Sequence, residues 1–76
     1  MNNKIFYHDQ DITLIIVLKA EHTARIISER KDIGFQDAYD LFVHSETSTA
    51  LMYPESLLWT ENAEYIADMY ERSFER

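Results

Sequence analysis

The stretch ITLIIVLKAEHTARIISERK, residues 12–31, decides the fold. Apolar residues surround its first two turns, and the later turns narrow to one stripe through Ala20, Ala24 and Ile27. The β-branched residues at positions 15–17 would also suit a strand. We favour a helix because the pattern continues without a break to about residue 31. A helix that is apolar on most sides is buried, so the sequence predicts a long buried N-terminal helix.

Charged residues support this helix. Glu21 with Arg25, and Arg25 with Glu29, place opposite charges four residues apart, which stabilises a helix. Before the helix, Asp9 or Asp11 could serve as its N-cap. Residues 1–8 fit a short strand, a helical turn or an extended arm, and the sequence does not decide among them.

Three shorter helices follow, predicted from apolar stripes that recur at helical spacing over residues 35–44, 47–53 and 61–74. Each has a candidate cap before it, in the order Gly34, Ser45 and Thr60. Pro54 ends the third helix because proline lacks an amide hydrogen, and residues 54–59 form the principal loop. Asp68 and Arg72 are expected to pair on the outer face of the last helix.

Length and composition limit the architecture. The 76 residues suffice for one domain, 1–76, with a thin margin of stability. The chain has no cysteine, which excludes disulfides and thiolate zinc sites, and its one glycine and one proline suggest few tight turns. We therefore predict an all-α fold, a small bundle of three to four helices.

The net charge of −7 is unevenly distributed. Residues 1–31 carry +1, whereas residues 32–76 carry −8. The acidic half would repel phosphate backbones, so we expect no nucleic-acid partner and instead a basic protein surface. The apolar run Leu14–Leu18 is too short to span a membrane or to act as a signal sequence, which predicts a cytoplasmic protein without a membrane partner.

The sequence shows no pattern typical of catalysis. His8, His22 and His44 lack the spacing of a local zinc site. The neighbours His44, Ser45 and Glu46 do not face one another as a catalytic triad must, and a capping role explains Ser45 better. We therefore expect no enzyme, no metal and no cofactor.

Aromatic and acidic residues mark a candidate interface in the C-terminal half. Tyrosine and tryptophan are enriched at interface hot spots, and charged residues commonly form the rim. Trp59 follows the only proline and is the candidate anchor, although packing in the core is the alternative for this residue. The predicted partner-binding residues are Tyr53, Glu55, Trp59, Glu61, Glu64, Tyr65, Asp68 and Met69.

Self-association is a second expectation. The first helix is apolar on more sides than short helices can cover, which would expose Leu14, Ile16 and Leu18. Because symmetric dimers are the commonest oligomers, this predicts a homodimer. Alternatively, the segment around Phe6 folds over the exposed side.

The run IGFQDAYDLF, residues 33–42, resembles a recurring sequence motif of an uncharacterised family of short helical bacterial proteins. Leu58-Trp59-Thr60 and Tyr65-Ile66 stand where that family has a Leu-His-Thr triplet and a Tyr-Ile pair. Some members are encoded beside toxin-like ADP-ribosyltransferase domains, so the resemblance implies an antitoxin-like or accessory role. The chain is thus predicted to be a small acidic protein-interaction module, and the alternative is a structural homodimer with no separate ligand.

Overall fold

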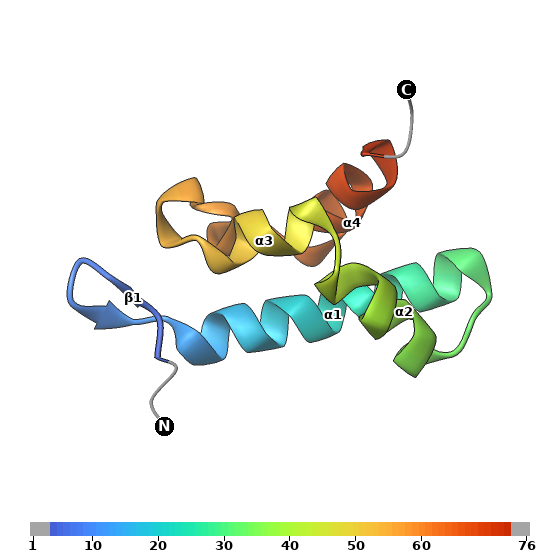
Figure 1. The fold of residues 1–76 in the computed structure, drawn as a ribbon, viewed down its shortest axis with the longest axis horizontal. Helices are drawn as coiled ribbons and strands as arrows, with labels where there is room; N and C mark the ends of the chain where they lie inside the picture. The colour runs from blue at the N-terminus through green and yellow to red at the C-terminus, as the bar shows by residue number, and fades with distance from the viewer. Residues whose placement is uncertain (1–3, 74–76) are drawn as a thin grey trace.

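The structure, a computed structural model, describes residues 4–73. It is mostly helical, so the all-α prediction is confirmed in outline (Figure 1). Four α-helices are described, together with a two-stranded hairpin and two 3-10 turns. In chain order they are β1 (Phe6–Tyr7), β2 (Gln10–Asp11), α1 (Thr13–Lys31), α2 (Phe35–Val43), α3 (Glu46–Met52), η1 (Pro54–Ser56), η2 (Leu58–Thr60) and α4 (Ala63–Arg72).

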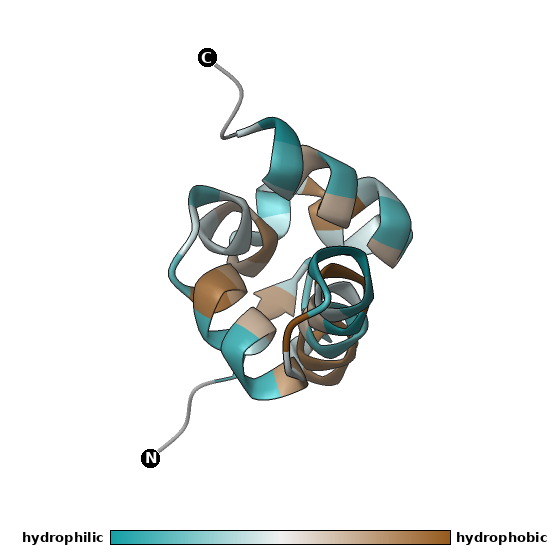
Figure 2. Cartoon of the chain, turned by 90° about the vertical axis from the view of Figure 1, so that its right-hand side faces the viewer, coloured by the Kyte–Doolittle hydropathy of each residue, from teal (hydrophilic) through white to brown (hydrophobic). Residues whose placement is uncertain are grey.

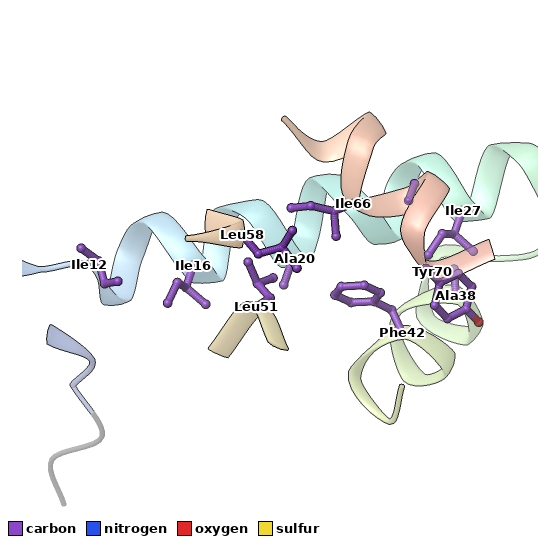
Figure 3. Close-up of a cluster of buried hydrophobic side chains, with 11 residues drawn as sticks. Ile12, Ile16, Ala20, Ile27, Ala38, Phe42, Leu51, Leu58, Ile66 and Tyr70 are labelled. Carbon is purple, nitrogen blue, oxygen red and sulfur yellow. The ribbon is translucent and has the colours of Figure 1, made fainter. Parts of the chain in front are cut away.

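The core lies along one side of α1, because its buried residues recur every three or four positions (Figure 3). Leu51 of α3, Leu58 of η2 and Ile66 of α4 pack against this side. At the other end of the core, Phe42 of α2 packs against Tyr70 of α4, with ring centroids 5.9 Å apart. The shared hydrophobic cluster comprises Ile12, Ile16, Ala20, Ile27, Ala38, Phe42, Leu51, Leu58, Ile66, Ala67 and Tyr70.

The long buried helix predicted at the N-terminus is not confirmed, because α1 is buried along part of its surface. Leu14 and Leu18 are exposed as expected, at 67% and 45%, whereas Ile16, the third residue predicted to be exposed, is only 1% exposed. Looking along α1, Figure 2 shows brown segments of this helix on the side that faces away from the other helices. The helix is therefore buried along one side only.

The N-terminal segment contains a short strand, one of the three conformations that the sequence left open, and this strand pairs with residues 10–11 in a hairpin that was not predicted. Phe6 pairs with Asp11 and Tyr7 with Gln10. His8 and Asp9 make the turn with φ angles of 50° and 66°, the left-handed geometry that two-residue hairpin turns require. The amide of Ile12 then donates to the carbonyl of Ile5 at 2.8 Å, which fixes the hairpin to the start of α1.

The cap of α1 differs from the prediction. Ile12 occupies the N-cap position and provides no side-chain hydrogen bond. Asp9 lies in the hairpin turn, whereas the carboxylate of Asp11 accepts from the amide of Thr13 at 3.0 Å. Hydrogen bonds from Thr13 lower the pKa of the Asp11 carboxyl.

The start of α4 is also corrected. Helix α4 begins at Ala63 instead of residue 61, and Asn62 caps it by accepting from the amide of Tyr65 at 2.8 Å. Thr60, the predicted cap, belongs to η2 and donates to the carbonyl of Leu57. The predicted end of this helix at residue 74 lies outside the described residues. The predicted caps Gly34 and Ser45 are confirmed as N-cap residues of α2 and α3.

The predicted ion pairs within helices are absent from the part of the chain that the structure describes. No salt bridge joins Glu21 to Arg25, Arg25 to Glu29, or Asp68 to Arg72 among residues 4–73. The guanidinium of Arg30 instead reaches from α1 to α4. Charge pairing in this fold thus holds two helices together rather than supporting one helix.

Candidate protein-interaction surface

The segment between α3 and α4 forms one end of the molecule, drawn in orange in Figure 1. Two large side chains are exposed here, Tyr53 at 61% and Leu57 at 44%, and Tyr65 in the first turn of α4 is 43% exposed. Tyr53 and Tyr65 were predicted to bind a partner. Leu57 was not predicted to bind a partner. The sequence did contain a sign of its exposure, because Leu57 and Leu58 are adjacent in a short turn, where only one of the two side chains can face the core.

Hydrogen bonds hold this segment in one conformation. The hydroxyl of Ser56 donates to the carbonyl of Ala50 at 2.6 Å and accepts from the amide of Leu58 at 3.1 Å. Leu57 has a left-handed backbone, with φ at 58°. This turns its side chain outward while Leu58, 5% exposed, enters the core. A fixed backbone reduces the entropy lost when a partner binds.

Trp59 supports this segment from inside. It is partly buried against the core, and its indole N–H donates to the carbonyl of Pro54 at 2.9 Å. The ring of Tyr7 meets it edge-on, with centroids 5.5 Å apart. Trp59 therefore connects the hairpin, the turn after Pro54 and the core.

Asp68 is paired within the molecule. The guanidinium of Arg30 lies 2.8 Å from its carboxylate and 3.2 Å from that of Glu71. The hydrogen bond that Arg30 donates to Asp68, with a smaller effect of the one to Glu71, raises the pKa of Arg30, although burial opposes the shift. Because Asp68 and Glu71 are both paired with Arg30, they attract a basic partner less strongly than unpaired carboxylates would.

Met69 is partly buried against the core. It lines a hollow of about 320 Å³ between α3 and α4, together with Ala50 and Arg72. Its side chain joins two helices, so it lies beside the exposed tyrosines rather than among them.

Three of the predicted acids remain without an ionic partner in the described part of the chain: Glu55, Glu61 and Glu64. All three are exposed. Lys19 approaches this region, but its ammonium group donates to the backbone carbonyl of Glu61 at 2.6 Å rather than to a carboxylate. We call the exposed set the acidic aromatic surface, and it consists of Tyr53, Glu55, Leu57, Glu61, Glu64 and Tyr65.

A larger hollow, of about 580 Å³, lies where α2, α3 and α4 meet. Two of its polar side chains, those of His44 and Ser45, have structural partners. A ring nitrogen of His44 lies 2.8 Å from the carbonyl of Asp40, and the hydroxyl of Ser45 donates to the carbonyl of Phe42 at 2.6 Å while capping α3. His44 and Ser45 therefore hold helix ends, as a capping role predicts.

Residues 4–73 contain no group of three or more histidines and carboxylates arranged to hold a metal ion. Within the same range, no helix combines the length and apolar character needed to cross a membrane. Comparisons with protein-family models, with curated proteins and with solved structures find no match for this chain.

Proposed function

We propose that this chain is a small protein-interaction module that binds a basic partner through the acidic aromatic surface. One observation carries the proposal: two exposed tyrosines, Tyr53 after α3 and Tyr65 in the first turn of α4, flank in sequence three exposed carboxylates that form no salt bridge in the described part of the chain. Exposed aromatic residues supply binding energy, and the unpaired carboxylates attract and orient a basic partner.

The antitoxin-like or accessory role implied by the family resemblance is a special case of this proposal. In that case the basic partner is the toxin-like protein encoded nearby. A cytoplasmic location and the absence of catalysis belong to the same proposal.

The test uses lysine- and arginine-rich helical peptides as probes, with acidic peptides of equal length as controls. In a nuclear magnetic resonance titration of the whole chain, we expect shift changes concentrated between residues 53 and 65. Reversing two charges, Glu61→Lys with Glu64→Lys, should slow association and reduce its dependence on salt.

The matched control is Asp37→Lys with Asp40→Lys on α2, which changes the net charge equally at another face. If both double variants weaken binding to the same extent, only net charge matters and the proposed surface is wrong. Tyr65→Ala should weaken binding by about 2 kcal/mol if Tyr65 is a hot spot.

The second candidate is a structural homodimer with no separate ligand. The exposed side of α1 favours it, because Leu14 and Leu18 are large apolar residues in contact with water. Dimerisation through α1 alone does not exclude partner binding at the acidic aromatic surface, but the second candidate as stated has no such partner.

A further inference from the structure

Three apolar side chains form a ridge on the outer side of α1. Leu14, Val17 and Leu18 are 67%, 50% and 45% exposed. Residues three and four positions apart lie on the same side of a helix, so the three side chains adjoin. The ridge ends at Leu18, because the next residue along this side of the helix, Glu21, is charged.

An apolar hollow of about 300 Å³ lies directly beside this ridge, between α1, α2 and α3. Val17 belongs to both, because it also lines the hollow. Buried Ile16 forms part of its lining, and Val43 and Met52 line it with 36% and 51% of their surface exposed. One face of the molecule therefore carries a ridge and a hollow next to each other.

We propose that this face binds a second copy of the chain, with Leu14 and Leu18 of each copy filling the hollow of the other. A two-fold symmetric interface uses the same patch on both subunits, so that patch must complement itself. A ridge beside a hollow meets this requirement, because a two-fold rotation brings each ridge over the opposite hollow.

Charge distribution favours a second copy over an acidic or a basic partner. Residues 1–31, which include all of α1, carry +1, whereas residues 32–76 carry −8. The side chains that form the ridge and line the hollow are all uncharged. Two copies that meet through α1 thus bring nearly neutral surfaces together.

The size of the molecule also permits this interface. A stable dimer takes about 800 Å² from each subunit. The chain exposes 5272 Å² in total, and its longest extents are 38 and 26 Å. Helix α1 runs along the length of the molecule, so a face built on it can supply that area (Figure 1).

The experiment measures the mass of the whole chain by sedimentation equilibrium from micromolar to millimolar concentration. We expect a monomer–dimer equilibrium. Leu14→Gln with Leu18→Gln should weaken the dimer at least about tenfold, since both changes remove apolar contacts without altering charge or helix propensity greatly. Leu41→Gln is the matched control, because Leu41 is 50% exposed on α2 outside the ridge and the hollow.

A second readout does not depend on the stability of these variants. The chain has no cysteine, so Leu18→Cys or Leu41→Cys introduces a single thiol. Alkylation at position 18 should slow as protein concentration rises, whereas alkylation at position 41 should not change. A monomer at millimolar concentration overturns the proposal. So does a dimer that Leu41→Gln weakens and the α1 variant leaves intact.

Discussion

Trp59 shows how one side chain can hold an exposed surface in place without belonging to it. Its indole N–H donates to the carbonyl of Pro54 and its ring contacts Tyr7, so Trp59 fixes the position of the turn after α3. Tyr53, 61% exposed, can then face solvent from a fixed backbone. The structure thus supports the core alternative for Trp59 and leaves the tyrosines as candidate anchors.

Replacing Trp59 should therefore affect stability before it affects binding. Trp59→Phe removes the donor to Pro54 and should cost about 1 kcal/mol, which lowers the melting temperature by about 4–8 °C in a chain of this size. Trp59→Ala should cost more, because the contact with Tyr7 is lost as well. Thermal unfolding and peptide affinity are measured on the same samples. Unchanged stability with lost affinity would show instead that Trp59 contacts the partner.

Tyr70 gives the protein a dependence on alkaline pH. It is 2% exposed, and burial, with a smaller effect of Glu71, raises the pKa of its phenol above the ordinary value of 10.0. The phenol ionises at a lower pH in the unfolded chain than in the folded chain. The contribution of Tyr70 to folding stability is therefore fully present below about pH 10 and is lost as the pH rises through the higher pKa of the folded state.

Tyr70→Phe should remove this component of the pH dependence while preserving the packing against Phe42. Denaturant unfolding between neutral and strongly alkaline pH measures it, and absorbance titration of the folded chain should lose its last-ionising tyrosine. If the free energy of unfolding falls equally with alkaline pH in the unaltered chain and in Tyr70→Phe, Tyr70 is not the source of this pH dependence.

Among the helices, α4 offers a direct comparison between a predicted cap and the observed one. Asn62→Ala removes the acceptor for the amide of Tyr65 and should destabilise the protein by about 1 kcal/mol. Thr60→Ala removes an exposed hydroxyl that donates to Leu57, and a smaller loss is expected. Chemical denaturation of both variants measures their free energies of unfolding and shows which substitution destabilises the protein more. A larger loss for Thr60→Ala would place the start of the helix where the sequence suggested.

The helices could be predicted from sequence because each buries a stripe at 3.6-residue spacing. The predicted bounds of α2, 35–44, differ from Phe35–Val43 by one residue. The hairpin could not be predicted, since strands of two residues show no alternation. Its formation depends on contacts that α1 and Trp59 provide, through Ile5 and Tyr7.

The candidate surface was predictable in part. Composition and order along the chain identified Tyr53, Tyr65 and the acids between them. They could not show that Asp68 pairs with Arg30 instead of the predicted Arg72, because Arg30 lies 38 residues earlier in the chain. Nor could a pattern show which of Leu57 and Leu58 faces water, since that depends on a left-handed backbone at Leu57.

For the whole molecule, the two proposed interfaces should respond to salt in opposite directions. Added salt screens the attraction between the carboxylates and a basic peptide, so that complex should weaken. It also screens the repulsion between two copies that each carry −7, so the dimer should hold or tighten. Dissociation constants of both complexes at low and high salt provide the measurement. Parallel weakening of the two would mean that charge pairs hold the dimer.

Two polar attachments eleven residues apart on α1 join it to the C-terminal part of the fold: Lys19 donates to the carbonyl of Glu61, just before α4, and Arg30 donates to Asp68 and Glu71 within α4. A slip of one helical turn displaces a helix by about 5.4 Å, farther than any of these bonds can stretch. Both attachments would then fail at once. The buried apolar side chains supply the stability of this packing, and the two polar attachments add a preference for one sliding register of α4 along α1.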